Sequence, residues 1–184
     1  MKRTTSLLAA CVLAVASLAP VQAADISAPS RALNLIDDSA GYFGDSFGLN
    51  NSGNTFSDQF TFTVGAVPVD LDAIAASISG SAATGLDITA FSLYSAANAL
   101  VFGGTQIVSG AIDIWQLSAD VLSPGDYYLQ VEGAVVSNGA ASYGAALLLS
   151  PVPEPAMLGM LAGGLGLMGF VARRRTRKPA AQSA

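Results

Sequence analysis

The stretch that decides the fold is Phe56-Ser57-Asp58-Gln59-Phe60-Thr61-Phe62-Thr63-Val64. Side chains of a β-strand alternate between its two faces, so every second residue of this stretch shares a face. One face is apolar apart from a single acid and carries Phe56, Asp58, Phe60, Phe62 and Val64. The opposite face is polar and carries Ser57, Gln59, Thr61 and Thr63. This alternation predicts a strand with one buried face and one solvated face.

Asp58 falls on the apolar face, where a carboxylate without partners would be costly to bury. We expect it to lie near the start of the strand and to accept hydrogen bonds from loop N–H groups, which would fix how the chain enters the sheet. A calcium or other ligand site is the alternative, because Asp45, Asp70 and Asp72 are nearby in the sequence. Their spacing is not that of an EF-hand, so the sequence assigns no metal ligands.

Short apolar runs bounded by turn signals recur on both sides of this strand. They predict further strands near residues 42–49, 74–79, 87–94, 100–103, 111–117, 127–133 and 142–149. The apolar phase slips between Ile88 and Phe91, which indicates a bulge or burial on both faces. The glycine-rich segment 80–85 predicts a hairpin turn after the strand at 74–79.

No amphipathic helix pattern interrupts these runs. We therefore predict an all-β fold, a jelly-roll-like antiparallel β-sandwich of seven to nine strands from about Phe43 to Leu149.

The N-terminus has the features of an export signal. Lys2 and Arg3 precede an apolar run from residue 7 to residue 19, and Val21-Gln22-Ala23 supplies small residues at the spacing that signal peptidase recognises. We predict a signal peptide at residues 1–24, cleaved after Ala23 or Ala24. Cleavage before Cys11, as in a lipoprotein, is less favoured because little sequence would precede it. Without Cys11 the mature chain has no cysteine, which excludes disulfides, thiol catalysis and thiolate metal sites.

The C-terminus has three consecutive features: the motif Val152-Pro153-Glu154-Pro155, an apolar run from Ala156 to Ala172, and a basic cluster of Arg173, Arg174, Arg175, Arg177 and Lys178. Two prolines around one acid predict a stiff, extended linker. The uncharged run predicts one transmembrane helix of roughly 25 Å, near the short limit for a span. Its glycines add almost nothing to membrane partitioning, and the basic cluster should hold the C-terminus in the cytoplasm.

This order of Pro-Glu-Pro, short glycine-rich helix, arginine cluster and chain end resembles the PEP-CTERM sorting signal of Gram-negative bacteria. The resemblance implies that an exosortase-type membrane protease recognises Val152, Pro153, Glu154 and Pro155 and removes the helix. The protein would be a membrane-bound precursor first, and would then lie at the cell surface or outside the cell. An ordinary C-terminal membrane anchor is the alternative. In addition, Phe56, Asp58 and Phe60 match the F-x-D-x-F signature of one family of PEP-CTERM proteins.

The sequence therefore divides into three parts. Residues 1–24 are the predicted signal peptide, residues 25–150 the extracellular β-sandwich domain, and residues 151–184 the sorting signal, with its helix at 156–172 and its basic tail at 173–178.

The composition of residues 25–150 excludes several function classes. This part contains one cation, Arg31, and twelve acids, so its formal charge is -11, which argues against binding of nucleic acid or anionic lipid. The sequence has no histidine, which removes Ser-His-Asp and Cys-His catalysis and zinc–histidine sites. No pair of acids is placed across a cleft by the sequence, and no glycine-rich phosphate loop follows a strand. We expect no enzymatic activity and no cofactor.

Two functions remain. The first is a structural surface or secreted protein associated with the extracellular polysaccharide or biofilm matrix, as the resemblance implies, with signal peptidase and the exosortase as processing partners. The second is a carbohydrate-binding module on the same sandwich, with Tyr94, Trp115 or Tyr128 stacking on sugars. We expect Trp115 to lie in the core, which would favour the structural function. An accessible row of aromatic residues on one sheet face would favour binding.

Overall fold

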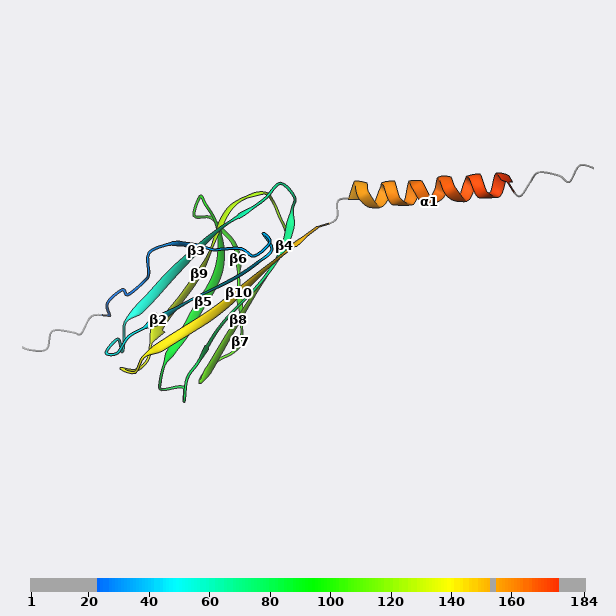
Figure 1. Ribbon diagram of the computed structural model, residues 1–184. Coiled ribbons are helices and arrows are strands. Elements are labelled where there is room, and N and C mark those ends of the chain that lie inside the picture. The colour runs from blue at the N-terminus through cyan, green and yellow to red at the C-terminus, as the bar shows by residue number, and fades with distance from the viewer. Residues whose placement is uncertain (1–22, 153–154, 176–184) are drawn as a thin grey trace, which may run out of the picture.

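The computed structural model describes residues 23–152 and 155–175. The predicted signal peptide lies outside these residues, except for Ala23 and Ala24. Two β-sheets face each other, and one helix follows them in the chain (Figure 1).

Within the described residues, ten strands form two five-stranded sheets. In spatial order, sheet A contains β1 (Arg31–Ala32), β3 (Thr55–Val64), β9 (Gly125–Val135), β5 (Leu86–Ser95) and β6 (Leu100–Gly103). Sheet B contains β2 (Ala40–Phe47), β10 (Ala141–Pro151), β4 (Val69–Ile78), β8 (Ile112–Leu122) and β7 (Thr105–Val108). Neighbouring strands are antiparallel, except that β1 runs parallel to β3. The predicted all-β antiparallel sandwich is confirmed at this level.

The chain alternates between the sheets instead of building one sheet after the other. From β2 to β5, and again from β8 to β10, each strand lies in the sheet opposite to the preceding strand. The jelly-roll-like arrangement expected from the sequence stays a prediction. The chain also changes sheets between β6 and β7, at Gly104.

The hairpin prediction for residues 80–85 is wrong. β4 pairs with β10 and β8, whereas β5 pairs with β6 and β9 in the other sheet. A glycine-rich turn can connect two sheets as readily as two neighbouring strands, so its composition did not distinguish the two cases. The short strands β1 and β7 were not predicted. The expected irregularity in β5 is present as a register shift between Ile88 and Ala90.

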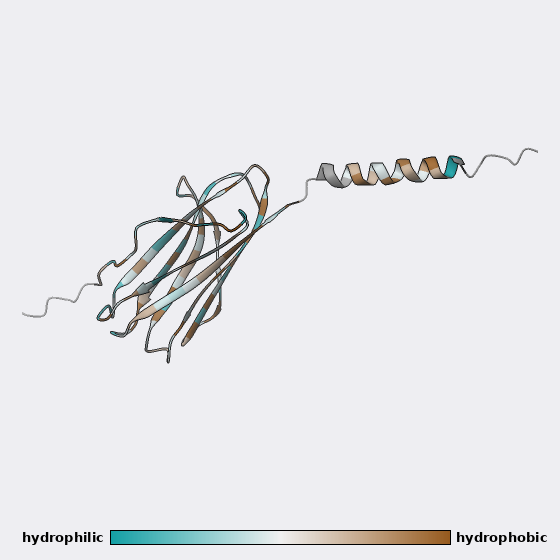
Figure 2. Ribbon diagram, viewed as in Figure 1, coloured by the Kyte–Doolittle hydropathy of each residue, from teal (hydrophilic) through white to brown (hydrophobic). Residues whose placement is uncertain are grey.

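The core lies between the two sheets and contains the inward-facing residues of both. As the alternation predicts, β3 buries Phe56, Phe60, Phe62 and Val64. The facing strands of sheet B contribute Leu71, Leu117, Leu147 and Leu149, among others. Figure 2 shows hydrophobic and hydrophilic residues mixed along the strands, which is the pattern that burial of one face requires.

Helix α1 spans Pro155–Arg175 and includes the whole predicted helix at residues 156–172. In the part of the chain that the structure describes, no helix is long and apolar enough to cross a membrane. The prediction of a transmembrane helix is therefore not confirmed. The segment has a low mean hydropathy for a transmembrane helix because five of its residues are glycines, which contribute almost nothing to membrane partitioning: Gly159, Gly163, Gly164, Gly166 and Gly169.

Candidate functional site

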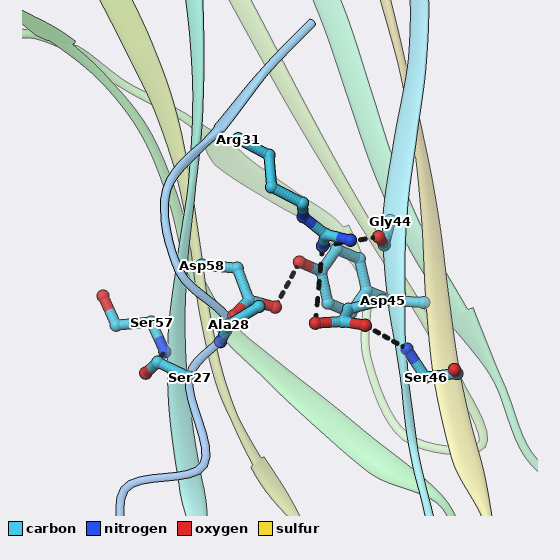
Figure 3. A network of polar contacts seen from close by, with 9 residues as sticks. Ser27, Ala28, Arg31, Gly44, Asp45, Ser46, Ser57 and Asp58 are labelled. Carbon is cyan, nitrogen blue, oxygen red and sulfur yellow. Dashed lines mark hydrogen bonds and ion pairs between the residues drawn. The ribbon is translucent and has the colours of Figure 1, made fainter.

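Asp58 is only 1% exposed, and both of its carboxylate oxygens accept hydrogen bonds. The N–H of Ala28 donates to one oxygen at 2.7 Å, and the hydroxyl of Tyr143 donates to the other at 2.6 Å (Figure 3). Ala28 belongs to the segment before β1, whereas Tyr143 lies on β10 of the opposite sheet. The carboxylate therefore joins the N-terminal segment to both sheets, and this geometry supports a structural role.

Burial sets the protonation behaviour of this pair. Burial raises the pKa of Asp58, and the hydrogen bonds from Tyr143 and Ala28 oppose part of that rise. Burial and the bond to Asp58 also raise the pKa of the Tyr143 hydroxyl well above its usual value. Tyr143 therefore remains a hydrogen-bond donor throughout the physiological pH range.

The segment before β2 lies along the edge of β3. Main-chain N–H groups of Ile26 and Leu33 donate to carbonyl oxygens of Thr55 and Thr61 at 2.9 and 2.8 Å. The N–H of Ser57 donates to the hydroxyl of Ser27 at 2.7 Å. These bonds cover an edge of sheet A that would otherwise present unpaired main-chain groups.

Arg31 connects the same segment to sheet B. Its Nη2 donates to the carbonyl oxygen of Gly44 at 3.0 Å and lies 3.4 Å from the carboxylate of Asp45 (Figure 3). Its guanidinium also lies over the ring of Phe60, 5.1 Å from the centroid. The one cation of residues 25–150 thus makes contacts within the domain.

Of the acids considered for calcium, Asp45 lies near enough to Asp58 to affect its pKa but is paired with Arg31, whereas Asp70 and Asp72 bond to other groups. The Asp70 carboxylate accepts the N–H of Val121 at 2.9 Å, and that of Asp72 accepts the hydroxyl of Ser118 at 2.7 Å. Across residues 23–152 and 155–175, no group of three or more Asp, Glu, His or Cys side chains is arranged to hold a metal ion.

A second buried carboxylate, Asp113 on β8, was not identified from the sequence. It is 2% exposed and accepts the N–H of Gly110 at 3.2 Å. Its other oxygen accepts the hydroxyl of Ser77 and the N–H of Ile88, both at 3.4 Å. The alternation of Asp113 with Trp115 and Leu117 was the available signal, because these three residues share a face.

The structure separates the three aromatic candidates for sugar stacking. Trp115 is partly buried against the core, and its Nε1 donates to the carbonyl oxygen of Ile88 at 2.9 Å. Tyr94 on β5 and Tyr128 on β9 are instead paired across the outer face of sheet A. Their rings stack with centroids 5.1 Å apart, and the Tyr128 hydroxyl donates to Asn98 at 3.1 Å. Tyr128 is only 9% exposed, so little of its ring is open to a ligand.

A groove of about 710 Å³ lies beside Tyr128 on this outer face. Its lining includes polar side chains of β3, β9 and the 96–98 loop that were not predicted as site residues: Gln59, Thr61, Thr63, Asn98 and Asp126. The polar face of β3 was visible in the sequence, but its neighbours across the sheet were not.

The C-terminal segment begins where the sandwich ends. The last residue of β10, Pro151, pairs with Val69, and the N–H of Val152 donates to the carbonyl oxygen of Pro68 at 3.0 Å. Pro155 is the first residue of α1, a position that suits proline because the missing N–H has no helical partner there. Pro153 and Glu154 lie outside the described residues.

The basic cluster is described only in part. Arg173 and Arg174 are exposed at the end of α1, which closes with Arg175. Arg177 and Lys178 lie beyond the described range.

Comparison with curated proteins found no match to the chain. Among solved structures, the chain is similar to the pre-peptidase C-terminal domain of collagenase from Bacillus anthracis, at 21% identity and a TM-score of 0.37, covering 70% of this chain and 96% of that one. It is also similar to PliG of Aeromonas hydrophila, a periplasmic inhibitor of g-type lysozyme. This second likeness has 14% identity and a TM-score of 0.41, covering 69% of this chain and 100% of that one. Neither likeness carries an argument about function.

A family model gives the more specific finding. The model of the PEP-CTERM protein-sorting motif matches residues 151–175, which contain the Pro-Glu-Pro tripeptide, the glycine-rich helix and three arginines of the basic cluster. The match implies export to the cell surface and processing by an exosortase. The chain therefore carries the PEP-CTERM protein-sorting motif of exosortase-processed exported proteins.

Proposed function

We propose that this protein is a structural component of the cell surface or of the secreted polysaccharide or biofilm matrix, released by exosortase processing. The observation that carries the proposal is the position of the sorting motif. The motif match starts at Pro151, which is also the last residue of β10. Cleavage in the linker after Val152 would leave all ten described strands in place, so the sandwich is complete without the segment that is removed.

The predicted signal peptidase site also lies at the edge of the sandwich, at its N-terminal end. Ala24 is the first residue with described bonds to the sandwich: its N–H donates to Asn54 at 3.0 Å and its carbonyl oxygen accepts the N–H of Thr55 at 3.0 Å. Signal peptidase cleavage after Ala23 would preserve both contacts. The precursor would then remain at the cytoplasmic membrane through its C-terminal segment until the exosortase acts.

A non-catalytic role fits the chemistry of the domain. The sequence has no histidine and, between residues 25 and 150, a single cation, Arg31, which is bonded to Gly44 and Asp45. The buried carboxylates of Asp58 and Asp113 both accept hydrogen bonds from neighbouring groups. These acids support the fold, and we assign no catalytic residues.

Substitution of the motif acid tests the processing proposal. The Glu154→Ala variant should be exported through its N-terminal signal but should accumulate in the cytoplasmic-membrane fraction with residues 173–184 still attached. Asp120→Ala removes an exposed acid outside the motif and should be processed normally. Intact-mass measurement of the wild-type protein recovered outside the cell decides the outcome. A wild-type species that still carries residues 173–184 would mean permanent anchoring and would contradict the proposal.

A second candidate function is carbohydrate binding. The specific observation in its favour is the polar groove on the outer face of sheet A, whose lining includes Gln59, Asn98 and Asp126. A small number of polar side chains that converge on one groove is a suitable arrangement for sugar hydroxyls. A glycan array probed with the exported protein tests this function, and absence of binding to every glycan would contradict it.

A further inference from the structure

We propose that the groove on the outer face of sheet A binds an uncharged oligosaccharide. This inference rests on the carbohydrate-binding function proposed above, and it adds the position of the site and the charge of its ligand.

The groove has a rigid floor and two walls. The floor is formed by residues of β3 and β9, which pair along their whole length in the centre of sheet A. One wall is the segment 32–35, held against β3 by the bond from Leu33 to Thr61. The other wall is the loop that contains Asn98, which accepts the Tyr128 hydroxyl. Groups placed on paired strands are well positioned for recognition because the sheet fixes their spacing.

The lining offers both donors and acceptors. Gln59 contributes an amide, Thr61 a hydroxyl and Asp126 a carboxylate that accepts the Thr63 hydroxyl at 2.7 Å. Sugar hydroxyls both donate and accept, so they can pair with each of these groups. The volume of about 710 Å³ is within the usual range of roughly 300–1,000 Å³ for ligand sites. The groove is therefore large enough for a short oligosaccharide.

The charges around the groove select against acidic sugars. The titratable acids of its lining are Asp38 and Asp126, and the lining residues include no lysine or arginine. The surrounding domain has a formal charge of -11 over residues 25–150. A uronate or sulfated glycan would meet a negative potential without a compensating cation, whereas a neutral glycan would not.

Two other surfaces fit a sugar less well. A larger depression of about 840 Å³ is lined mainly by serine and glycine, and its lining has no amide or carboxylate side chain, so it offers fewer kinds of hydrogen-bonding group to a sugar. Tyr42 on the outer face of sheet B is 75% exposed, but the hollow around it is mostly aliphatic, with Ile74 and Leu148 in its lining. The groove beside Tyr128 instead brings amide, hydroxyl and carboxylate side chains together in one lining.

Binding measurements on the exported protein test the proposal. Calorimetric titration with cellohexaose, laminarihexaose and maltohexaose supplies the neutral probes, and hexagalacturonate supplies an anionic probe of equal length. At least one neutral probe should bind, and hexagalacturonate should not bind at low ionic strength. Gln59→Leu should weaken neutral binding by about tenfold, because a sugar hydroxyl would lose its partner.

Gln116→Leu is the matched control, since it makes the same change at an exposed position on the outer face of sheet B. It should leave binding unchanged. The double change Asp38→Asn and Asp126→Asn should increase the binding of hexagalacturonate relative to that of the neutral probes. Circular dichroism of each variant shows that it is folded.

The possible results test the position of the site and the charge of its ligand separately from carbohydrate binding itself. Neutral binding that is equally strong in the Gln59→Leu variant would place the site elsewhere and overturn the groove, while carbohydrate binding itself would stand. Tighter binding of hexagalacturonate than of every neutral probe would overturn the charge selection. Failure of all probes, and of every glycan on the array, would overturn both the groove and the carbohydrate-binding function.

Discussion

At the scale of single residues, the sequence predicted one of the two hydrogen-bond partners of Asp58 but not the other. Period-2 alternation placed this acid among buried phenylalanines and required partners for it. A loop N–H was the expected partner, and the N–H of Ala28 provides it. The second partner, Tyr143, is 85 positions away on the other sheet, and no local pattern connects the two residues.

The Asp58→Ala variant should lower the free energy of unfolding by about 1–3 kcal/mol, because the partly buried Ala28 N–H and the buried Tyr143 hydroxyl would both lose their acceptor. Tyr143→Phe is the control, since it removes only the hydroxyl and leaves the bond to Ala28 in place. Chemical denaturation monitored by Trp115 fluorescence measures both variants. An unchanged midpoint for Asp58→Ala would show that the carboxylate does not stabilise the fold. A midpoint that rises with added calcium would instead support the metal alternative.

The pH dependence of stability gives a separate prediction for Asp58. Burial raises its pKa in the folded state above the ordinary value of about 3.9, so the folded state holds this proton more tightly than the unfolded state. The stability that protonated Asp58 contributes is complete below the unfolded pKa and is lost as the pH rises through the folded pKa.

Asp58→Asn keeps an acceptor and removes the titration. The wild-type free energy of unfolding minus that of Asp58→Asn should therefore fall as the pH is raised from about 3.5 towards neutrality. Other carboxylates contribute to both proteins and cancel in this difference. Denaturation curves at a series of pH values provide the measurement, and a difference that increases with pH would mean that the pKa of Asp58 is lowered.

At the scale of secondary structure, alternation identified strands but not their partners. The long strands were predicted because each buries one face, and a single sequence carries that signal. Pairing depends on residues far apart in the chain, so the path between the sheets was not visible. β4 illustrates a further difficulty, because its larger residues Ile74 and Ile78 face outward while Ala73 and Ala75 face the core. Ala75 pairs with Trp115, and a small residue there leaves room for the indole.

Gly104, where the chain changes sheets between β6 and β7, allows a test at this scale. A Cβ atom at this position would lie 2.7 Å from the Phe91 carbonyl oxygen and 3.0 Å from that of Gln116. Gly104→Ala should therefore cost about 1–3 kcal/mol, as expected for overpacking against a backbone that cannot move freely. At the adjacent Gly103 a Cβ atom would meet nothing within 4 Å, so Gly103→Ala is the matched control. Equal thermal midpoints for the two variants would show that the crossover adjusts without cost.

At the scale of the whole molecule, the sorting segment was predictable and the groove was not. Residues 151–175 form one continuous motif, so their order was sufficient for identification. The groove is assembled from residues 32–35, β3, the loop at 96–98 and the start of β9, and only the fold brings these together. Tyr94 and Tyr128 were proposed as separate aromatic residues, and it is the register between β5 and β9 that places them side by side.

The separation of charge along the chain leads to a final prediction. Arg173, Arg174, Arg175, Arg177 and Lys178 all lie beyond the sandwich, whose residues 25–150 carry a charge of -11. Each cation near an anionic membrane surface contributes roughly 1 kcal/mol of attraction, so five of them favour binding by about 5 kcal/mol at low salt. The full-length chain should therefore bind vesicles containing anionic lipid more strongly than vesicles of zwitterionic lipid alone.

Salt should reduce this difference, because the attraction is screened within a Debye length of about 8 Å at physiological ionic strength. The exported wild-type protein, having lost the basic cluster, should bind neither kind of vesicle. A full-length variant with Arg173, Arg174 and Arg175 changed to glutamine keeps the apolar residues of α1 but loses three cations. Its binding therefore distinguishes the electrostatic attraction from apolar partitioning. Co-sedimentation with vesicles measures all three proteins. Strong binding of the exported protein to anionic vesicles would show that the sandwich itself contacts membranes, against the repulsion expected from its charge.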